Sequence, residues 1–197
     1  MKERPILFSG AMVRAILDGR KTQTRRVVKP QPQYGDVAGL FASWQFRKPR
    51  EDGFYLWPNA REHIHAICPY GQPGDRLWVR ETWGYNPDFP GMTSLACFRA
   101  DPEHKYDGIK WKPSIHMPRA ACRLMLEITG VRVERLNDCS EADAEAEGIA
   151  FLREVPDVDE TLTARQLYEC LWDGINGASA WEANPWVWVV EFKRITA

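Results

Sequence analysis

A lysine, a threonine and two arginines lie close together near the start of the chain, in a pattern that could do chemistry. Lys21, Thr24, Arg25 and Arg26 stand within six consecutive residues. A threonine hydroxyl is a weak nucleophile at neutral pH and needs a base within hydrogen-bonding distance. A lysine amine becomes such a base when burial or neighbouring cations lower its pKa. The segment could therefore activate a hydroxyl, while its remaining cations could bind a phosphate or stabilise an oxyanion.

The elements on either side of this segment decide where these side chains point. Ser9 is a favourable N-cap for a helix, and Gly19 tolerates the left-handed backbone with which a helix often ends. Residues 22–28 are rich in β-branched types and predict a strand. Lys21 and Thr24 would point to opposite faces of one regular strand, so we expect Lys21 to lie in the turn and to reach back toward Thr24.

The rest of the chain predicts further strands and helices. Alternating residues predict a strand over 76–83, with Leu77 and Val79 on one face, and Pro5–Phe8 reads as a short buried strand. Ser140 and Asp143 have the spacing of a capping box. The other expected elements are a strand over 122–136 with a bulge or turn at Gly130, a helix from 140 to Gly148, a helix over 163–172 with Leu167, Cys170 and Leu171 on its apolar face, a short strand over 95–99, a loop over 29–35, an aromatic hairpin over 41–57 and a strand over 186–193.

Residues 16–26 resemble the signature of the ASCH family, in which a helix is followed by a glycine, two cations and alternating hydroxyl residues. Further segments are similar to other parts of that family: 74–79 to its Gly-Asp turn and barrel strand, 126–131 to a central strand, 142–148 to a short acidic helix, and 186–194 to the closing aromatic strand. Together these segments cover about half of the chain. The overall pattern is similar to phage- and prophage-encoded ASCH proteins.

The resemblance implies an α+β fold, namely a PUA-like (ASCH) mixed β-barrel with flanking helices. A chain of 197 residues can bury one sizeable core, and we expect one domain over residues 1–197. Two insertions, at about residues 30–66 and 84–118, depart from compact members of the family. We expect the aromatic hairpin in the first insertion to extend the barrel or to cover its mouth.

The resemblance also implies an activity. The amidohydrolase branch of the ASCH family removes the acetyl group from N4-acetylcytidine with a lysine, a threonine three residues later and a glutamate on the short helix. The matching positions are Lys21, Thr24 and Glu147, although a shift in register would place Glu145 there instead. In this interpretation Thr24 is the nucleophile, Lys21 the base, and Glu147 the acid that protonates the departing cytosine N4.

Other cations and aromatic residues are candidates for contact with a substrate or RNA. Tryptophans beside loops, such as Trp83, Trp111 and Trp181, could stack on unpaired bases, whereas Trp186 and Trp188 lie in an apolar strand and are expected to pack. Residues 110–119 form a second basic and aromatic cluster that could border the same cleft. The candidate binding residues are Arg20, Thr22, Arg25, Arg26, Arg80, Trp83 and Arg119.

Two other functions use the same residues, and a purely structural interpretation is also available. A non-catalytic RNA-binding module would use Arg25 and Arg26 for phosphates, and a ribonuclease could act from the same cleft. Cations after a helix favour its dipole without any function, and threonine is common in strands. We favour the hydrolase, with RNA or a modified nucleoside as the partner.

Charge is segregated along the chain. The net charge is −1, yet residues 1–30 carry eight Lys and Arg against two acidic residues, and residues 138–160 carry nine Asp and Glu against Arg153. A polyanion could meet the basic part, but ordinary surface charge explains the pattern equally well. The balance does not fit a protein that coats long duplex DNA.

Composition argues against several other classes. The sequence has five cysteines and no C-x-x-C pair, which predicts reduced thiols. His63, His65 and Cys68 could supply three zinc ligands, but a fourth is not evident, so no metal and no cofactor are expected. The sequence shows neither a signal peptide nor a run of about 18 apolar residues, which predicts a cytoplasmic protein without a membrane partner.

Overall fold

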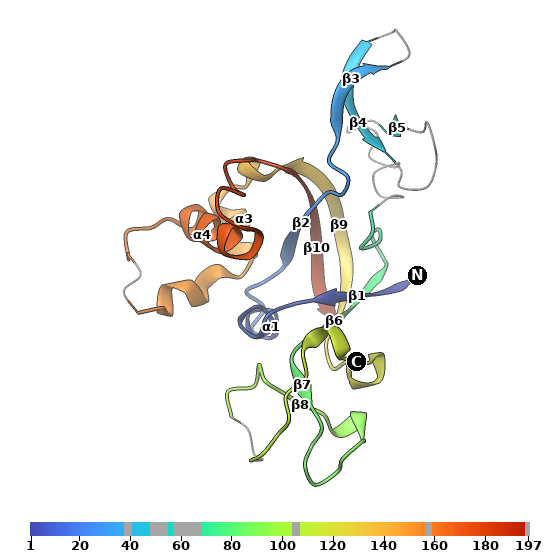
Figure 1. Ribbon diagram of the computed structural model, residues 1–197, viewed down its shortest axis with the longest axis vertical. Coiled ribbons are helices and arrows are strands. Elements are labelled where there is room, and N and C mark those ends of the chain that lie inside the picture. Colours follow the sequence, from blue (N-terminus) through green and yellow to red (C-terminus); the bar gives the residue numbers. More distant parts are fainter. Residues whose placement is uncertain (38–40, 48–54, 57–67, 104–106, 157–158, 196–197) are drawn as a thin grey trace.

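The computed structural model describes residues 1–37, 41–47, 55–56, 68–103, 107–156 and 159–195. Figure 1 shows a curved sheet in the middle of the molecule, a helical layer on one side of it and two appended parts. The strands are β1 (Glu3–Leu7), β2 (Gln23–Val27), β3 (Gln33–Val37), β4 (Phe41–Arg47), β5 (Tyr55–Leu56), β6 (Arg76–Arg80), β7 (Trp83–Gly84), β8 (Cys97–Phe98), β9 (Met125–Arg135) and β10 (Trp186–Ile195). The α-helices are α1 (Gly10–Leu17), α3 (Glu141–Ala146) and α4 (Ala164–Asn176), and the 3₁₀ helices are η1 (Thr93–Leu95), η2 (Ser114–His116), η3 (Arg119–Ala121), η4 (Leu136–Asp138) and η5 (Ile149–Glu154).

The central sheet has five strands in the order β1-β6-β9-β10-β2. β1 pairs with β6 in parallel, and the other pairs are antiparallel. The register of β9 against β10 shifts between Glu191 and Phe192, opposite Gly130 and Ile128, which confirms the bulge predicted near Gly130. β1 and β2 are the two edges of the sheet, and the guanidinium of Arg26 on β2 donates to the carbonyl of Leu7 on β1 over 2.8 Å.

The two faces of the sheet carry separate cores because the side chains alternate along each strand. Trp188 and Val190 of β10 pack with α1 and the inner residues of β6 and β9. Val187 and Val189 of β10 point the other way and pack with α3, η5 and α4. A third, smaller core lies around Trp83.

Local signals in the sequence explain where the helices begin and end. The side chain of Ser9 caps α1, and Ser140 and Thr163 each form a capping box at the start of α3 and α4. Gly19 has a φ of 74°, in the left-handed region that was expected after the first helix. The expected strands β6, β9 and β10 are confirmed within a few residues of their predicted bounds.

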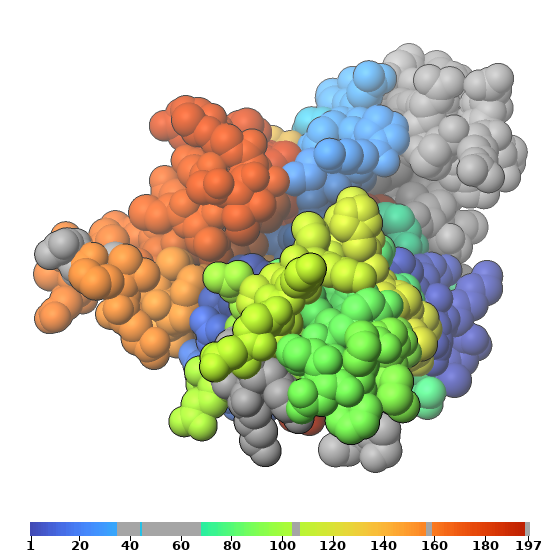
Figure 2. Space-filling view, turned by 60° about the horizontal axis from the view of Figure 1, so that its bottom comes forward, coloured from blue at the N-terminus to red at the C-terminus, as the bar shows by residue number. Residues whose placement is uncertain are grey.

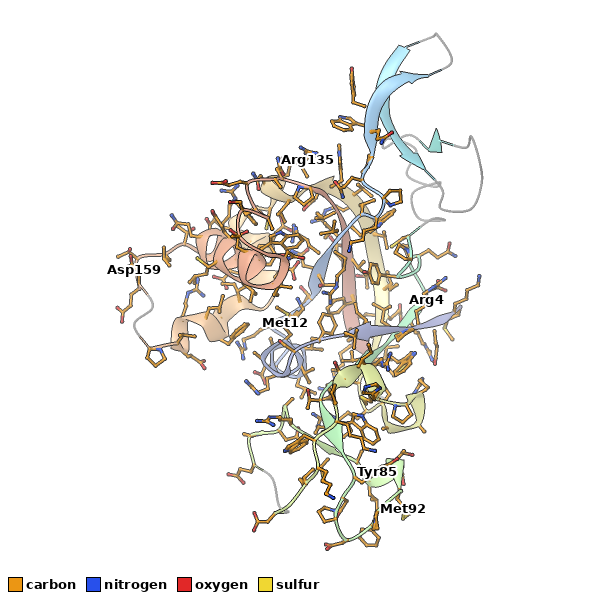
Figure 3. The ribbon with its side chains drawn as sticks, viewed as in Figure 1. Arg4, Met12, Tyr85, Met92, Arg135 and Asp159 are labelled. Atoms are coloured by element: carbon orange, nitrogen blue, oxygen red, sulfur yellow. The ribbon has the colours of Figure 1, made fainter. Side chains whose placement is uncertain are left out.

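The predicted insertions form the two appended parts in Figure 1. β3, β4 and β5 make a separate three-stranded sheet, so the expected hairpin is present, while the expected loop is wrong from Gln33 onward. Trp44 of β4 packs edge-on against Trp186 of β10, with ring centroids 5.4 Å apart, and the cation of Arg135 lies over both rings. Figure 3 shows Arg135 at the end of the sheet nearest this hairpin. The second insertion holds β7, β8 and short 3₁₀ helices, with Tyr85 and Met92 in it (Figure 3).

The α+β class is confirmed, whereas a closed barrel is not found among the described residues. β1 and β2 are not hydrogen-bonded to each other as strands, so the sheet stays open between them. The strand expected over 95–99 is reduced to Cys97–Phe98. No described helix combines the length and the apolar character needed to cross a bilayer.

Candidate active site

Lys21 lies in a turn between α1 and β2, and its amine is fully buried. Its backbone N–H donates to the carbonyl of Ala15, and the residue forms an isolated β-bridge with Glu147. The Nζ atom donates to Glu147 Oε2 over 2.7 Å, to the Glu147 carbonyl over 2.8 Å and to the Gln23 carbonyl over 2.8 Å. The placement in a turn agrees with the sequence, but the described bonds of Nζ do not include one to Thr24.

Glu147 follows directly after α3 and points into the molecule. Its side chain is 3% exposed, whereas Glu145 is half-exposed and pairs with Arg153 at the surface. Of the two candidate glutamates, it is therefore Glu147 that contacts Lys21. Gly148 makes the close approach to Lys21 possible, because a Cβ there would lie 2.7 Å from the Lys21 Cβ.

Arg25 is buried on the face of β2 that packs against the helical layer. It pairs with Val189 of β10, and its guanidinium contacts Glu134 at 2.6 Å, Asp143 at 3.3 Å and Glu147 at 3.4 Å. Its charge is therefore neutralised inside the protein, which contradicts the expectation that it binds phosphates. We call Lys21, Arg25, Glu134, Asp143 and Glu147 the ion-pair cluster.

Thr24 lies on the opposite face of β2 from Arg25, because neighbouring residues of a strand alternate. It pairs with Val190, is 3% exposed, and borders a cavity of about 380 Å³ between the sheet edge, α1 and α4. Met12, labelled on α1 in Figure 3, lines this cavity. The lining residues are Leu7, Phe8, Ser9, Met12, Thr24, Arg25, Arg26, Val27, Thr82, Ser114, Glu147, Tyr168, Leu171, Trp172, Ile175 and Asn176.

The surroundings of the ion-pair cluster shift several pKa values. Burial lowers the pKa of Lys21 below its ordinary 10.5; the charge of Glu147 opposes this effect, and Arg26 and Arg25 add to it. Burial, together with the nearby charge of Glu147, raises the pKa of Tyr168 well above 10.0. The Tyr168 phenol therefore stays protonated, and its O–H donates a hydrogen bond to Glu147 Oε1 over 3.2 Å.

Asp143, a member of the ion-pair cluster, shows how strongly the charges are coupled. Burial alone would raise the pKa of Asp143, but hydrogen bonds from Ser140 and Gln23 and the charge of Arg25 lower it well below 3.8. Arg132 also reaches Asp143, at 3.0 Å, and closes the cluster toward solvent. Lys21 and Arg25 of the basic start thus pair with Asp143 and Glu147 of the acidic later part inside the molecule.

The remaining residues of the predicted site divide into those at the cavity and those away from it. Arg26 lines it and stacks its cation over Phe8. Arg20 is exposed and pairs with Asp18 at 2.6 Å, and Thr22 is exposed before β2; neither lines the cavity. Arg80 lines a smaller neighbouring cavity.

The tryptophans predicted to contact a ligand are placed differently by the structure. Trp83 is 2% exposed and Trp181 is 4% exposed, so both pack inside the protein and the expectation of base stacking is wrong for them. Trp111 lies under the cation of Arg99. Arg119 pairs with Glu3 at 3.0 Å and does not line the cavity, although Ser114 of the same segment does.

The contribution of α4 to the cavity was missed by sequence reasoning. Tyr168, Leu171 and Trp172 line the cavity, whereas Cys170, which was assigned to the apolar face, is exposed. The helical period of the sequence does place Tyr168 beside Leu171 on one face, which is the available signal. That signal does not reveal that the phenol meets Glu147.

The possible zinc ligands His63 and His65 lie outside the described residues. Cys68 is buried, and burial raises the pKa of its thiol to about 11. Among the residues that the structure describes, no group of three His, Cys, Asp or Glu could hold a metal ion. The five cysteines are free thiols.

The chain was also compared with known proteins. No family model matches it, and no curated protein and no solved structure matches it. The candidate site therefore rests on its own geometry, and the likeness to the ASCH family is carried forward as a proposal.

Proposed function

We propose that this protein is an amidohydrolase that removes the acyl group from an N4-acylated cytidine. Thr24 is the nucleophile, Lys21 the base and Glu147 the acid. One observation carries the proposal: Thr24 and Glu147 border the same cavity of about 380 Å³, and Glu147 is hydrogen-bonded to the buried amine of Lys21 at 2.7 Å. A hydroxyl, an amine and a carboxyl group are the types that this reaction needs.

The bond between Lys21 and Glu147 can supply the required protonation states. Moving one proton from Nζ to Oε2 gives a neutral amine and a neutral carboxylic acid, and the lowered pKa of Lys21 favours this transfer. The neutral amine takes the proton of the Thr24 hydroxyl as its oxygen bonds to the acyl carbon. The bond from the acyl carbon to N4 then breaks, N4 receives the proton of Glu147, and water hydrolyses the acyl ester on Thr24 to a carboxylate.

Lys21 and Thr24 share no described hydrogen bond, so this mechanism requires a local rearrangement that brings the base into contact with the nucleophile. In the structure, the three donors of the Lys21 ammonium are used by Glu147 and Gln23. Loss of one proton from Nζ frees a lone pair that can turn toward Thr24. Substrate that approaches Glu147 is expected to drive this rearrangement.

The walls of the cavity suit a base better than a polyanion. Phe8, Met12, Leu171 and Trp172 supply apolar surface, and the charge of Arg25 is neutralised by carboxylates. A planar pyrimidine can pack between such side chains, with its polar edge toward Glu147. A PUA-like barrel that is open between β1 and β2 is the fold we propose, with the cavity at this opening.

Chromatographic detection of cytidine after incubation with N4-acetylcytidine tests the proposal. The wild-type protein should release cytidine, and Thr24→Ala and Glu147→Gln should each reduce kcat by on the order of 100-fold or more. Thr22→Ala is the matched control, because Thr22 is exposed and does not line the cavity. No cytidine from folded wild-type protein would reject the proposal.

A non-catalytic nucleoside- or RNA-binding module is the second candidate. The observation in its favour is that the Lys21 amine is engaged by acceptors other than Thr24, as in a purely structural ion pair. In that case the protein would bind cytidine or its acylated form in the same cavity without turnover. Thr24→Ala would then leave the affinity nearly unchanged.

A further inference from the structure

A second cavity lies next to the candidate active site and has a different character. Its volume is about 230 Å³, and its walls come from β1, the end of β6, β2 and Tyr70. It shares Leu7 and Arg26 with the larger cavity, so the two are neighbours along the opening between β1 and β2. Its lining residues are Pro5, Ile6, Leu7, Arg26, Tyr70 and Arg80.

This second cavity is lined by two cations and no carboxylate. Arg26 donates to the carbonyl of Leu7, and Arg80 donates to the carbonyl of Ile115. Neither forms an ion pair with a described acidic residue. The Nε atom of Arg80 is buried and lacks a hydrogen-bond partner among the described residues. A buried donor without a partner is costly, and a ligand oxygen would satisfy it.

Two other arginines of the described residues make a clear contrast. Arg25 contacts three carboxylates, and Arg123 forms a two-point pair with Glu81 at 2.9 and 3.0 Å. Among the described residues, Arg26 and Arg80 therefore have no acidic partner, and an external anion could pair with them. A guanidinium group matches the oxygens of a phosphate in geometry and charge.

Tyr70 adds a neutral donor to the same cavity. Burial raises the pKa of its phenol, and the charge of Arg26 only partly opposes this effect. The phenol therefore keeps its proton near neutral pH and can donate to a phosphate oxygen. The register supports the convergence of these groups, because Leu7 of β1 pairs with Arg80 of β6.

We propose that this second cavity binds a phosphate group of the substrate, so that the substrate is a phosphorylated pyrimidine nucleoside. This inference rests on the proposed function, in which the pyrimidine occupies the larger cavity. Arg26 lies between the two cavities and holds the phosphate on the side away from Thr24. A mononucleotide and a nucleotide within RNA share this chemistry.

Calorimetric titration separates the contribution of the phosphate to the binding affinity from the contribution of the nucleoside. We expect cytidine 5′- or 3′-monophosphate to bind at least tenfold more tightly than cytidine, as charge-assisted hydrogen bonds typically contribute. Arg80→Gln should bring this ratio of affinities close to one. Arg76→Gln is the matched control, because Arg76 lies on the same strand and face as Arg80 but does not line the cavity; it should keep the ratio.

Two further ligands complete the experiment. Inorganic phosphate alone should bind to the wild-type protein and bind more weakly to Arg80→Gln. A cytidine-containing trinucleotide that binds more tightly than either monophosphate identifies RNA as the source of the phosphate; equal or weaker binding identifies the mononucleotide. Thermal unfolding of each variant shows that it is folded.

Equal affinities for cytidine and both monophosphates, or an unchanged ratio in Arg80→Gln, would overturn the phosphate site. Absence of binding by both nucleotides and inorganic phosphate would overturn it as well. Failure of the amidohydrolase is seen separately, as absence of cytidine release from N4-acetylcytidine. If the protein prefers the phosphorylated ligands but releases no cytidine, the phosphate site is supported and the amidohydrolase is rejected.

Discussion

The Lys21–Glu147 pair combines a structural role with the proposed catalytic one. Both side chains are almost fully buried, at 0% and 3% exposed. Removing one partner of such a pair leaves a buried charge without compensation, which typically costs about 3–5 kcal/mol. A loss of activity in a Lys21 variant therefore carries information only when its stability is measured too.

We predict that Lys21→Met lowers the free energy of unfolding by about 3–5 kcal/mol. The double variant Lys21→Met/Glu147→Gln should recover part of this loss, because it also removes the carboxylate that has lost its closest cation and keeps only the longer contact to Arg25. Urea unfolding of the two single variants and the double variant measures the coupling. Additive effects would contradict a direct interaction between the two side chains.

Gly148 is required by the same contact. Its φ is 78°, and a Cβ there would lie 2.7 Å from the Lys21 Cβ and 2.9 Å from the Ala15 Cβ. Gly148→Ala should therefore destabilise the protein by at least about 2 kcal/mol. Gly174→Ala is the control within α4, where nothing lies within 4 Å of the added Cβ. It should stabilise by about 0.5–1 kcal/mol, and thermal unfolding of both variants checks the contrast.

At the scale of elements, a single carboxylate connects the first strand to the turn before β6. Asp75 accepts hydrogen bonds from the backbone N–H of Lys2 at 2.7 Å and from Arg4 at 2.8 Å. The bond from Lys2 lowers the pKa of Asp75 below its ordinary 3.8; burial opposes the shift, and the bond from Arg4 adds to it. The carboxylate is thus held ionised in the folded protein.

This shift makes part of the stability depend on pH. Because the pKa of Asp75 is lower in the folded than in the unfolded chain, its contribution is fully present above about pH 3.8. It is lost as the pH falls through the lower folded pKa. Asp75→Asn should therefore be less stable than wild type near neutral pH, and the difference should shrink in acid. Urea unfolding across this range tests it, with Asp88→Asn, an exposed carboxylate, as control.

The sequence predicts the individual helices and strands better than it predicts whether the sheet closes into a barrel. Ser9, Ser140 and Thr163 cap helices through local bonds, so short spacings are sufficient to find those starts. Whether β1 and β2 join into a barrel depends on the curvature accumulated over five strands, which no short pattern encodes. The expected barrel is consequently replaced by a sheet that remains open at its edges.

The candidate site was predictable to a similar extent. The alternation of side chains along a strand predicts that Thr24 and Arg25 point to opposite faces of β2. The three-residue spacing from Thr24 identifies Lys21 as the candidate base. The neutralisation of Arg25 depends on Glu134 and Asp143, which are more than a hundred residues away along the chain and approach only through the packing of β9 and α3. The burial of Trp83 in a separate small core is likewise a tertiary effect.

At the scale of the whole molecule, a few opposite charges pair inside the protein and most stay at its surface. In the space-filling view of Figure 2, the orange and red helical layer and the green to yellow segment from 84 to 121 stand on either side of N-terminal residues in blue. Within the described residues, Lys21 and Arg25 contact Asp143 and Glu147 of the helical layer and Glu134 of β9. The other charges mostly stay at the surface: Lys2, Arg14, Arg20 and Lys29 of the basic first part and Glu141, Glu145 and Glu154 of the helical layer are exposed.

The two cations of the second cavity limit the number of phosphates that the proposed site can bind. With Arg26 and Arg80 as the cations that meet phosphates there, the slope of log K against log salt for a single strand should be about −1.4. Fluorescence anisotropy of a labelled oligocytidine at several salt concentrations measures this slope. A slope steeper than about −3 would indicate an extended cationic surface and would contradict the proposed site.

The most direct measurement for the proposed enzyme is the position of the acyl group during a single turnover. Protein in excess over N4-acetylcytidine is quenched in acid at short times, digested and mapped by mass spectrometry. We predict one transient acetyl group, on the peptide that contains Thr24, which forms as cytidine is released and is absent in Thr24→Ala. Cytidine release with the acetyl group on another residue, or with an unmodified protein at every time, would contradict the assignment of Thr24 as nucleophile.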